Sequence, residues 1–392
     1  MRWAGNFTWV CVVAAARRAG AKPQGACRAT DSGQRHDPER KHRVLVPGSV
    51  LALIASIVAA PAVAQTEAEV RIGPADAPAL IVRGTTDADI FLPVLRAFLA
   101  TEPDLAIRYE QWGSNDLFAR ATEACAGGAE AADLLVSSAV DSVVRLANDG
   151  CAQAHVSEET ATLPAGQLWR DEVFGITQEP AVMVVNRAAV PDAPVTRFDL
   201  IDMLRPGGAR ESLRVATYDI EESGLGYLFA FMDSLQATTF GSLIEAFDRS
   251  GAVATCCSAE LIDGVVEGRW DLAYNVLGSY AEARAAESDE IAIVAPEDYT
   301  LMLSRAAFIP AGAARPEAAG RLVDFMLSGQ GRAVLRANHL IPRIDGLGVE
   351  DDVSIRPIPL TPVLLLTTDA AKRRLFIELW RNTFPGDRAA GP

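Results

Sequence analysis

Residues 79–100 read ALIVRGTTDADIFLPVLRAFLA and introduce the pattern on which the rest of the chain is built. The apolar run at residues 79–82 predicts a short buried strand, and the polar loop at residues 84–87 ends it. Residues 90–100 then place apolar side chains three or four positions apart, which predicts an amphipathic helix. A buried strand followed by such a loop and helix is typical of α/β folds.

The same alternation of strand, loop and helix continues through the chain. It predicts mainly parallel sheets with helices on both faces, because parallel strands need a crossover between them. In the first half we expect strands at residues 105–112 and 133–136, and helices at 115–126 and 141–148. Beyond residue 194 we expect strands at 213–219, 252–256, 271–276 and 290–295, and helices at 198–204, 226–234, 242–249, 258–267, 279–287, 315–327, 331–337 and 369–383.

Two longer extended segments, residues 173–186 and 301–309, interrupt this alternation, and a proline at position 180 divides the first of them. Segments of this kind suit crossings between two lobes. We therefore predict an α/β fold of two lobes joined by two hinge crossings. The predicted parts are an N-terminal extension with a cleaved signal peptide (1–64), the first part of lobe 1 (65–181), lobe 2 (182–301), and the return to lobe 1 with the C-terminal helices (302–392).

The N-terminal region contains a long uncharged segment at residues 44–64, VLVPGSVLALIASIVAAPAVA. Basic residues precede it and Ala-Val-Ala closes it, which is the organisation of a secretory signal peptide. A membrane anchor is the alternative, since about 20 apolar residues can span a bilayer. We predict cleavage before Gln65, a periplasmic location and no stable membrane insertion. Residues 1–40 show no helical or strand spacing of apolar side chains. Because a signal peptide should begin the chain, we expect translation to start near residue 40.

The charge of the chain argues against nucleic-acid binding. Its 392 residues include 36 basic and 51 acidic side chains, for a net charge of −15 and a pI near 4.8. Nine of the basic and three of the acidic residues lie in 1–64, so the predicted mature chain is still more acidic. Because a nucleic-acid-binding surface needs basic patches, we expect no nucleic-acid partner.

Four cysteines follow the predicted signal peptide, at positions 125, 151, 256 and 257. In an oxidising compartment, Cys125 and Cys151 could pair, and the adjacent Cys256 and Cys257 could form a bridge of their own. Equally, all four could be small apolar core residues. No histidine cluster or second cysteine pair accompanies them, so we predict no metal site and no cofactor.

Catalytic motifs are missing from the sequence. No G-x-S-x-G, H-E-x-x-H, P-loop or G-x-G-x-x-G pattern occurs. The two histidines beyond residue 64, His155 and His339, have no nucleophile in a recognisable setting. We therefore predict that the protein is not an enzyme.

Small polar residues follow several predicted strands and precede helices. They are Thr85, Thr86, Ser137, Ser138, Ser223 and Gly224. Ligands of α/β sheets bind outside the carboxyl ends of the strands, where hydroxyls and helix N-termini suit carboxylate, phosphate or sugar oxygens. Ordinary helix capping uses the same residue types and is the alternative for any one of these loops.

Three longer stretches resemble the second lobe of a known family. They are EPAVMVVN at residues 179–186, RVATYDIEESGLGY at 214–227 and EGRWDLAYNVLGSYA at 267–281, followed by FMLSGQG at 325–331 and IRPIPL at 355–360. In this order they are similar to type 2 periplasmic solute-binding proteins of ABC transporters. The similarity is to the iron(III)-type branch, which includes relatives such as the phosphoglycerate transport regulatory protein.

The resemblance implies a two-lobed clamp that closes on a small solute and delivers it to a membrane permease. It also implies that Glu179, Asn275 and Tyr280 contact the ligand. Iron-binding members carry two adjacent tyrosines as ligands, whereas Ser279-Tyr280 stands in this chain and no Tyr-Tyr pair occurs. The loss of a phenolate argues against iron, and Tyr280 could instead hydrogen-bond an organic anion.

We therefore expect a monomeric solute-binding protein that captures a small organic anion, either a carboxylate or a phosphorylated metabolite, for an ABC permease. Two alternatives use the same clamp. One is a regulatory protein that reports ligand occupancy to a two-component sensor kinase, and the other is a ferric-iron-binding protein.

Overall fold

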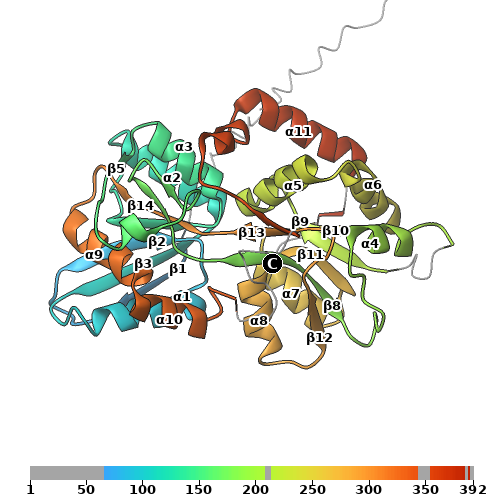
Figure 1. Cartoon of the computed structure of the whole chain (residues 1–392), viewed down its shortest axis with the longest axis horizontal. Helices are drawn as coiled ribbons and strands as arrows, with labels where there is room; N and C mark the ends of the chain where they lie inside the picture. Colours follow the sequence, from blue (N-terminus) through green and yellow to red (C-terminus); the bar gives the residue numbers. More distant parts are fainter. Residues whose placement is uncertain (1–65, 208–212, 343–353, 385–386, 389–392) are drawn as a thin grey trace, which may run out of the picture. The chain divides into compact units, whose positions relative to one another are not determined.

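Two β-sheets, each covered by helices, form the protein (Figure 1). The structure is a computed structural model that describes residues 66–207, 213–342, 354–384 and 387–388. These residues all belong to one compact unit. The predicted signal peptide and its cleavage site lie outside the described residues. No helix in the described ranges is long and apolar enough to cross a membrane.

The first sheet has a parallel centre with antiparallel strands on either side. Parallel pairing joins the second and third strands and the second and fourth strands, as the strand–helix alternation predicts. In order across the sheet, its strands are β1 (Thr66–Ile72), β3 (Ala106–Trp112), β2 (Ala79–Gly84), β4 (Leu134–Ser137), β14 (Ala306–Pro310), β7 (Val173–Gly175) and β6 (Leu168–Trp169), and β5 (Ala152–Gln153) also pairs with β14.

The second sheet is built in the same manner. Its strands, in order, are β15 (Ile355–Pro357), β13 (Thr300–Leu303), β8 (Glu179–Asn186), β11 (Leu272–Leu277), β9 (Val215–Tyr218), β10 (Val253–Thr255) and β16 (Asp387–Arg388), and β12 (Ile291–Val294) also pairs with β8. β11, β9 and β10 are parallel, whereas β8 runs antiparallel to its neighbours. Both sheets thus contain more antiparallel strand pairs than predicted. At the crossings, β8 and β14 run antiparallel to the neighbouring strands of the sheets that they join.

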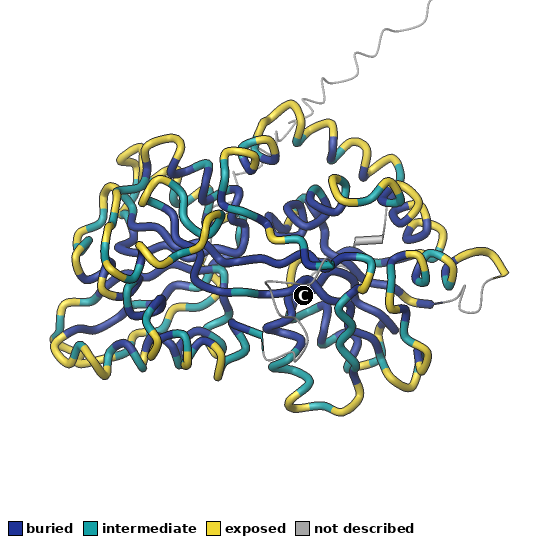
Figure 2. Tube along the Cα trace, viewed as in Figure 1, coloured by how far each residue is buried: buried dark blue, intermediate teal, exposed yellow. Residues whose placement is uncertain are grey.

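Helices cover both faces of each sheet. Around the first sheet lie α1 (Ala88–Leu99), α2 (Ser114–Cys125), α3 (Val140–Asn148), α9 (Pro316–Leu327) and α10 (Gly329–Ala337). Around the second lie α4 (Arg197–Met203), α5 (Gly224–Gln236), α6 (Phe240–Ser250), α7 (Ser258–Val266), α8 (Gly278–Ala285) and α11 (Ala370–Thr383). Successive residues of one strand enter different cores: Leu135 packs with α2 and α3, and its neighbours Leu134 and Val136 pack with α1 and α9. In Figure 2 the strands are accordingly buried and the outer helix faces exposed.

The two crossings lie where the sequence predicts them. The first runs from β7 into β8, and the second from β13 into β14, so each leads from one sheet to the other. β8 and β13 pair with each other, with Met302 opposite Pro180. The fold predicted from the sequence, two α/β lobes joined by two crossings, is therefore confirmed.

The C-terminal segment contributes to both lobes. Residues 306–337 complete the first lobe as β14, α9 and α10. β15 then joins the second sheet, the 3₁₀ helix η2 (Pro362–Leu366) packs against α3 of the first lobe, and α11 packs on α6 (Figure 1). Thr367 donates a hydrogen bond to the buried Asp141 carboxyl of α3 at 2.7 Å. The segment predicted as the return to lobe 1, residues 302–392, thus also packs against lobe 2 through β15 and α11.

Candidate functional site

A cavity of about 570 Å³ lies between the lobes, at ends of strands from both sheets. The residues of the first lobe that line it are Glu67, Thr85, Asp87, Trp112, Gly113, Ser114, Asn115, Asp116 and Ser138. Those of the second lobe are Tyr218, Glu222, Ser223, Leu225, Cys256, Cys257, Ser258, Ala259, Leu277 and Tyr280. This volume suits a small molecule. It lies in the crevice where α/β sheets bind their ligands.

The first lobe supplies hydroxyl groups at the ends of two parallel strands. Thr85 follows β2 and Ser138 follows β4, and these strands are neighbours. The Thr85 hydroxyl accepts a hydrogen bond from the backbone N–H of Ser138 at 2.9 Å, and the two hydroxyls lie 3.1 Å apart. The pair therefore holds the two strand ends together at the wall of the cavity.

Helices begin around the cavity. Asp87 and Ser223 are the N-cap residues of α1 and α5, and Ser114 and Ser258 are the first residues of α2 and α7. The Ser223 hydroxyl accepts a hydrogen bond from the backbone N–H of Gly226 at 3.0 Å, as an N-cap does. Helix N-termini carry partial positive charge and favour electron-rich ligand atoms.

The two lobes contact each other directly at the cavity. The backbone N–H of Gly224 donates to the Ser114 hydroxyl at 2.8 Å. The side-chain amide of Asn115 donates to the backbone carbonyls of Glu221 and Glu222 at 2.9 and 2.7 Å. The start of α2 is therefore hydrogen-bonded to the start of α5.

Tyr280 makes a second contact between the lobes at the cavity. Its hydroxyl donates to the Asp87 carboxyl at 3.0 Å and accepts from the backbone N–H of Asp87, also at 3.0 Å. Burial raises the pKa of the Asp87 carboxyl above its ordinary value, although the hydrogen bond from Tyr280 offsets part of this effect. Burial also raises the pKa of Tyr280 well above its ordinary value, so the phenol stays protonated and donates.

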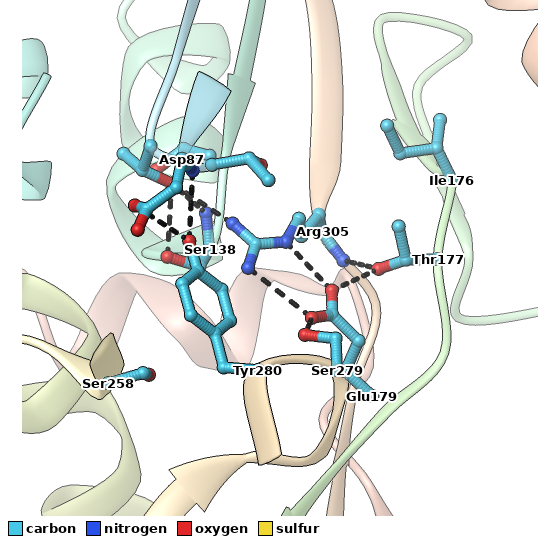
Figure 3. Close-up of polar contacts among 12 residues, drawn as sticks. Asp87, Ser138, Ile176, Thr177, Glu179, Ser258, Ser279, Tyr280 and Arg305 are labelled. Atoms are coloured by element: carbon cyan, nitrogen blue, oxygen red, sulfur yellow. Dashed lines mark hydrogen bonds and ion pairs between the residues drawn. The ribbon is translucent and has the colours of Figure 1, made fainter. Parts of the chain in front are cut away.

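A buried ion pair lies behind Tyr280, at the two crossings (Figure 3). Arg305, just before β14, donates from Nε to the Glu179 carboxylate at 2.8 Å, and both side chains are almost fully buried. Thr177 donates to the same carboxylate at 2.8 Å, and Ser279 also donates to it. Burial alone would lower the pKa of Arg305, but the charge of Glu179, the hydrogen bond to it and the nearby Tyr280 and Tyr109 together raise this pKa. The pair thus links the two crossings through charged side chains.

Carboxylates outnumber basic groups on the cavity wall. Glu67, Asp87, Asp116 and Glu222 line it, and no lysine or arginine does so among the residues that the structure describes. Arg305 lies one layer back and reaches Thr85, with Nη1 at 3.4 Å from the hydroxyl. The interior surface combines hydroxyls with the aromatic side chains of Trp112, Tyr218 and Tyr280. The wall can thus accept hydrogen bonds from a ligand as well as donate to it.

The structure brings four of the predicted site residues together on the cavity wall: Thr85, Ser138, Ser223 and Tyr280. Gly224 lies next to them, where its N–H joins the lobes.

The other four predicted site residues are not among the lining residues in the described part of the chain. Thr86 is buried and its carbonyl accepts from Tyr109, whereas the Ser137 hydroxyl accepts from the N–H of Ala139. Glu179 belongs to the ion pair behind the cavity. Asn275 lies inside the second lobe, where its amide donates to Asp233 at 2.7 Å.

Several lining residues were not predicted, including Asp87, Ser114 and the cysteine pair. Asp87 belongs to the same loop as Thr85 and could have been found there, because aspartate is a preferred N-cap residue. Ser114 likewise follows a predicted strand and begins a helix. Both possible disulfides form, between Cys125 and Cys151 and between Cys256 and Cys257. The second lies on the cavity wall.

Two lobes with two crossings and a cavity of this kind define the class of periplasmic binding proteins. Residues 79–340 match the model of the bacterial extracellular solute-binding protein family, and the chain belongs to this family. A solved relative is the substrate-binding protein of an ABC transporter from Agrobacterium tumefaciens, with 31% sequence identity and a TM-score of 0.76. That alignment covers 82% of this chain and 99% of the relative.

More distant structures share the fold. Iron-bound HitA from Pseudomonas aeruginosa has 18% identity and a TM-score of 0.58, with 78% of this chain and 99% of HitA covered. AfuA from Actinobacillus pleuropneumoniae, solved with fructose-6-phosphate, has 14% identity and a TM-score of 0.60, with 79% and 99% covered. No match is found among curated proteins. The protein is thus an extracellular solute-binding protein of the ABC-transporter type.

Proposed function

We propose that this protein binds a small hydroxyl- or amino-bearing solute, uncharged or cationic, in the cavity between its lobes and delivers it to an ABC permease. The composition of the cavity wall carries this proposal. Four carboxylates and several hydroxyls can accept hydrogen bonds from such a solute, and no lysine or arginine lines the cavity in the described ranges to neutralise an anion. Trp112 and Tyr280 add aromatic surface for its apolar parts.

The organic anion expected from the sequence is the second candidate. It is favoured by the helix N-termini at Ser114, Ser223 and Ser258, which offer partial positive charge to carboxylate or phosphate oxygens. This attraction would act against the carboxylates of the wall. The sensor-kinase role would use the same cavity, because it differs only in the protein that recognises the closed form.

Ferric iron is supported less well. The cavity wall holds two phenols, Tyr218 and Tyr280, and burial raises the pKa of both. Iron would have to displace these protons as well as the hydrogen bonds that the phenols make to Ser258 and Asp87. A visible charge-transfer band on addition of ferric citrate would support this candidate instead.

A thermal-shift screen of the chain from Gln65 onward tests the proposal. The compounds are sugars, polyols, amino acids, amines, carboxylates, phosphorylated metabolites and ferric citrate. A solute at about 100 times its Kd adds roughly 2.7 kcal/mol of stability. We expect a selective rise in Tm with one group of polyols, sugars or amines. A rise confined to carboxylates or phosphorylated compounds would establish the second candidate, and no rise with any compound would contradict both.

A further inference from the structure

Two adjacent cysteines lie on the wall of the cavity, at the junction between β10 and α7. Cys256 and Cys257 are exposed and joined to each other by a disulfide. Glu260 lies in the first turn of α7, with Oε2 at 3.6 Å from the sulfur of Cys256. One carboxylate oxygen of Glu260 and the two sulfurs all lie within 4.8 Å of one another. Three potential metal ligands therefore meet at one point.

The surroundings of this cluster favour a cation. Asp87, Asp116 and Glu222 line the same cavity without a lysine or arginine among the described lining residues. Thiolates select zinc-like and other thiophilic cations, and a carboxylate completes such sites.

We propose that, when reduced, Cys256, Cys257 and Glu260 form a binding site for one thiophilic divalent cation, and that the disulfide closes this site. A low-molecular-weight thiol opens it: two thiols give up two electrons and two protons, the Cys256–Cys257 bond breaks, and the thiols leave as their own disulfide. The cation then replaces the two cysteine protons and forms two metal–sulfur bonds. Three protein ligands leave a fourth position for water.

The Cys125–Cys151 disulfide differs from this pair in its spacing along the chain and in its surroundings. Cys125 and Cys151 are 26 positions apart and line a different cavity of about 290 Å³, mostly among alanine and glycine residues. Within the described residues, Cys256, Cys257 and Glu260 are the one group of three that could hold a metal ion. The Cys125–Cys151 disulfide therefore provides a matched control.

Equilibrium dialysis of the full-length protein against Cd²⁺ alone, without solute, tests the site. The variants are Cys256→Ser with Cys257→Ser, Cys125→Ser with Cys151→Ser, Glu260→Gln and Asp263→Asn. Asp263 is a carboxylate on the same helix that pairs with Arg284 instead. Each protein is measured after reduction and removal of the reductant under nitrogen, and again after oxidation.

The reduced wild type is expected to bind one Cd²⁺ per chain more than the Cys256/Cys257 variant. The Cys125/Cys151 variant should keep this extra ion, and oxidation should remove it. Glu260→Gln should weaken its binding at least about tenfold, while Asp263→Asn should not. The proposal is overturned if the reduced wild type binds no more Cd²⁺ than the Cys256/Cys257 variant. If the Cys256/Cys257 variant does not fold, the Cys125/Cys151 variant decides the matter. Equal binding of Cd²⁺ by its oxidised and reduced forms overturns the proposal. Because no solute is present, a negative result leaves the solute screen unaffected.

Discussion

Tyr280 and Asp87 join the two lobes through a pair of hydrogen bonds, both 3.0 Å long, although the residues lie 193 positions apart in the chain. One bond runs from the phenol to the carboxyl, and the other from the backbone N–H of Asp87 to the phenol. Closure of two-lobed binding proteins is a hinge motion. The pair can therefore form only when the lobes approach each other across the cavity.

Replacing Tyr280 with Phe removes both bonds while keeping the ring. We expect a loss of about 1 to 3 kcal/mol in the free energy of unfolding, because two bonds are lost and each usually contributes about 0.5 to 1.5 kcal/mol. We also expect weaker binding of whichever solute the screen identifies. Tyr227→Phe is the matched control, because the buried hydroxyl of Tyr227 has no hydrogen-bond partner among the residues that the structure describes. Urea unfolding of both variants checks this, and equal effects would contradict the role given to Tyr280.

The Asp87 carboxyl should make stability depend on pH. Its folded-state pKa is raised by burial above the ordinary value of 3.8, so the folded protein retains a proton that the unfolded chain has lost. Stability therefore falls as pH rises from about the unfolded value through the folded one. Asp87→Asn should flatten this fall and keep the contact with Tyr280. Tm measured across this pH window tests it, with the exposed Asp76→Asn as control. An unchanged slope in Asp87→Asn would refute it.

The Glu179–Arg305 pair should stabilise the crossings strongly only as a pair. Glu179→Gln leaves the buried guanidinium without its carboxylate, for which we expect a loss of about 3 to 5 kcal/mol. A double variant with Arg305→Met should lose less than the sum of the two single losses. As a control, Asp149→Asn removes the exposed pair with Arg145 and should cost about 0.5 kcal/mol. Guanidinium unfolding measures the wild type, the two single variants, the double variant and Asp149→Asn. Additive losses in the double variant would contradict the coupling.

The Cys125–Cys151 disulfide should add about 3 to 4 kcal/mol, because it closes a loop of 26 positions in the unfolded chain. The Cys125→Ser, Cys151→Ser variant should unfold at correspondingly lower denaturant concentration. Solute affinity should stay the same, since neither cysteine lines the inter-lobe cavity in the described structure. A tenfold loss of affinity in the folded variant would show that this disulfide supports the cavity as well.

The sequence was sufficient to predict the elements that position the cavity. The spacing of apolar residues predicted α1, which is observed at Ala88–Leu99, and the long extended segments predicted the crossings at β8 and β13. These features could be predicted because they depend on residues close together in the sequence. β1 was missed because its polar and charged side chains alternate with only partly buried ones at the edge of the sheet.

Two of the predicted site residues depend on contacts that no local pattern reveals. Glu179 forms an ion pair with Arg305, which lies 126 positions away in the sequence. Asn275 has a positive φ of 61° at a register shift in β11, and its side chain bonds Asp233 inside the second lobe. Residue type and strand-end position could therefore suggest these residues but could not say which way they face.

Isothermal titration with the solute found in the screen can locate its binding site between the lobes, with the help of two tryptophan variants. Ala259→Trp places a bulky ring on the cavity wall, and Ala119→Trp places the same ring on the exposed side of α2. We predict one binding site per chain in the wild type and in Ala119→Trp, and at least a tenfold loss of affinity in folded Ala259→Trp. Undiminished binding by Ala259→Trp would show that the solute binds outside the cavity between the lobes.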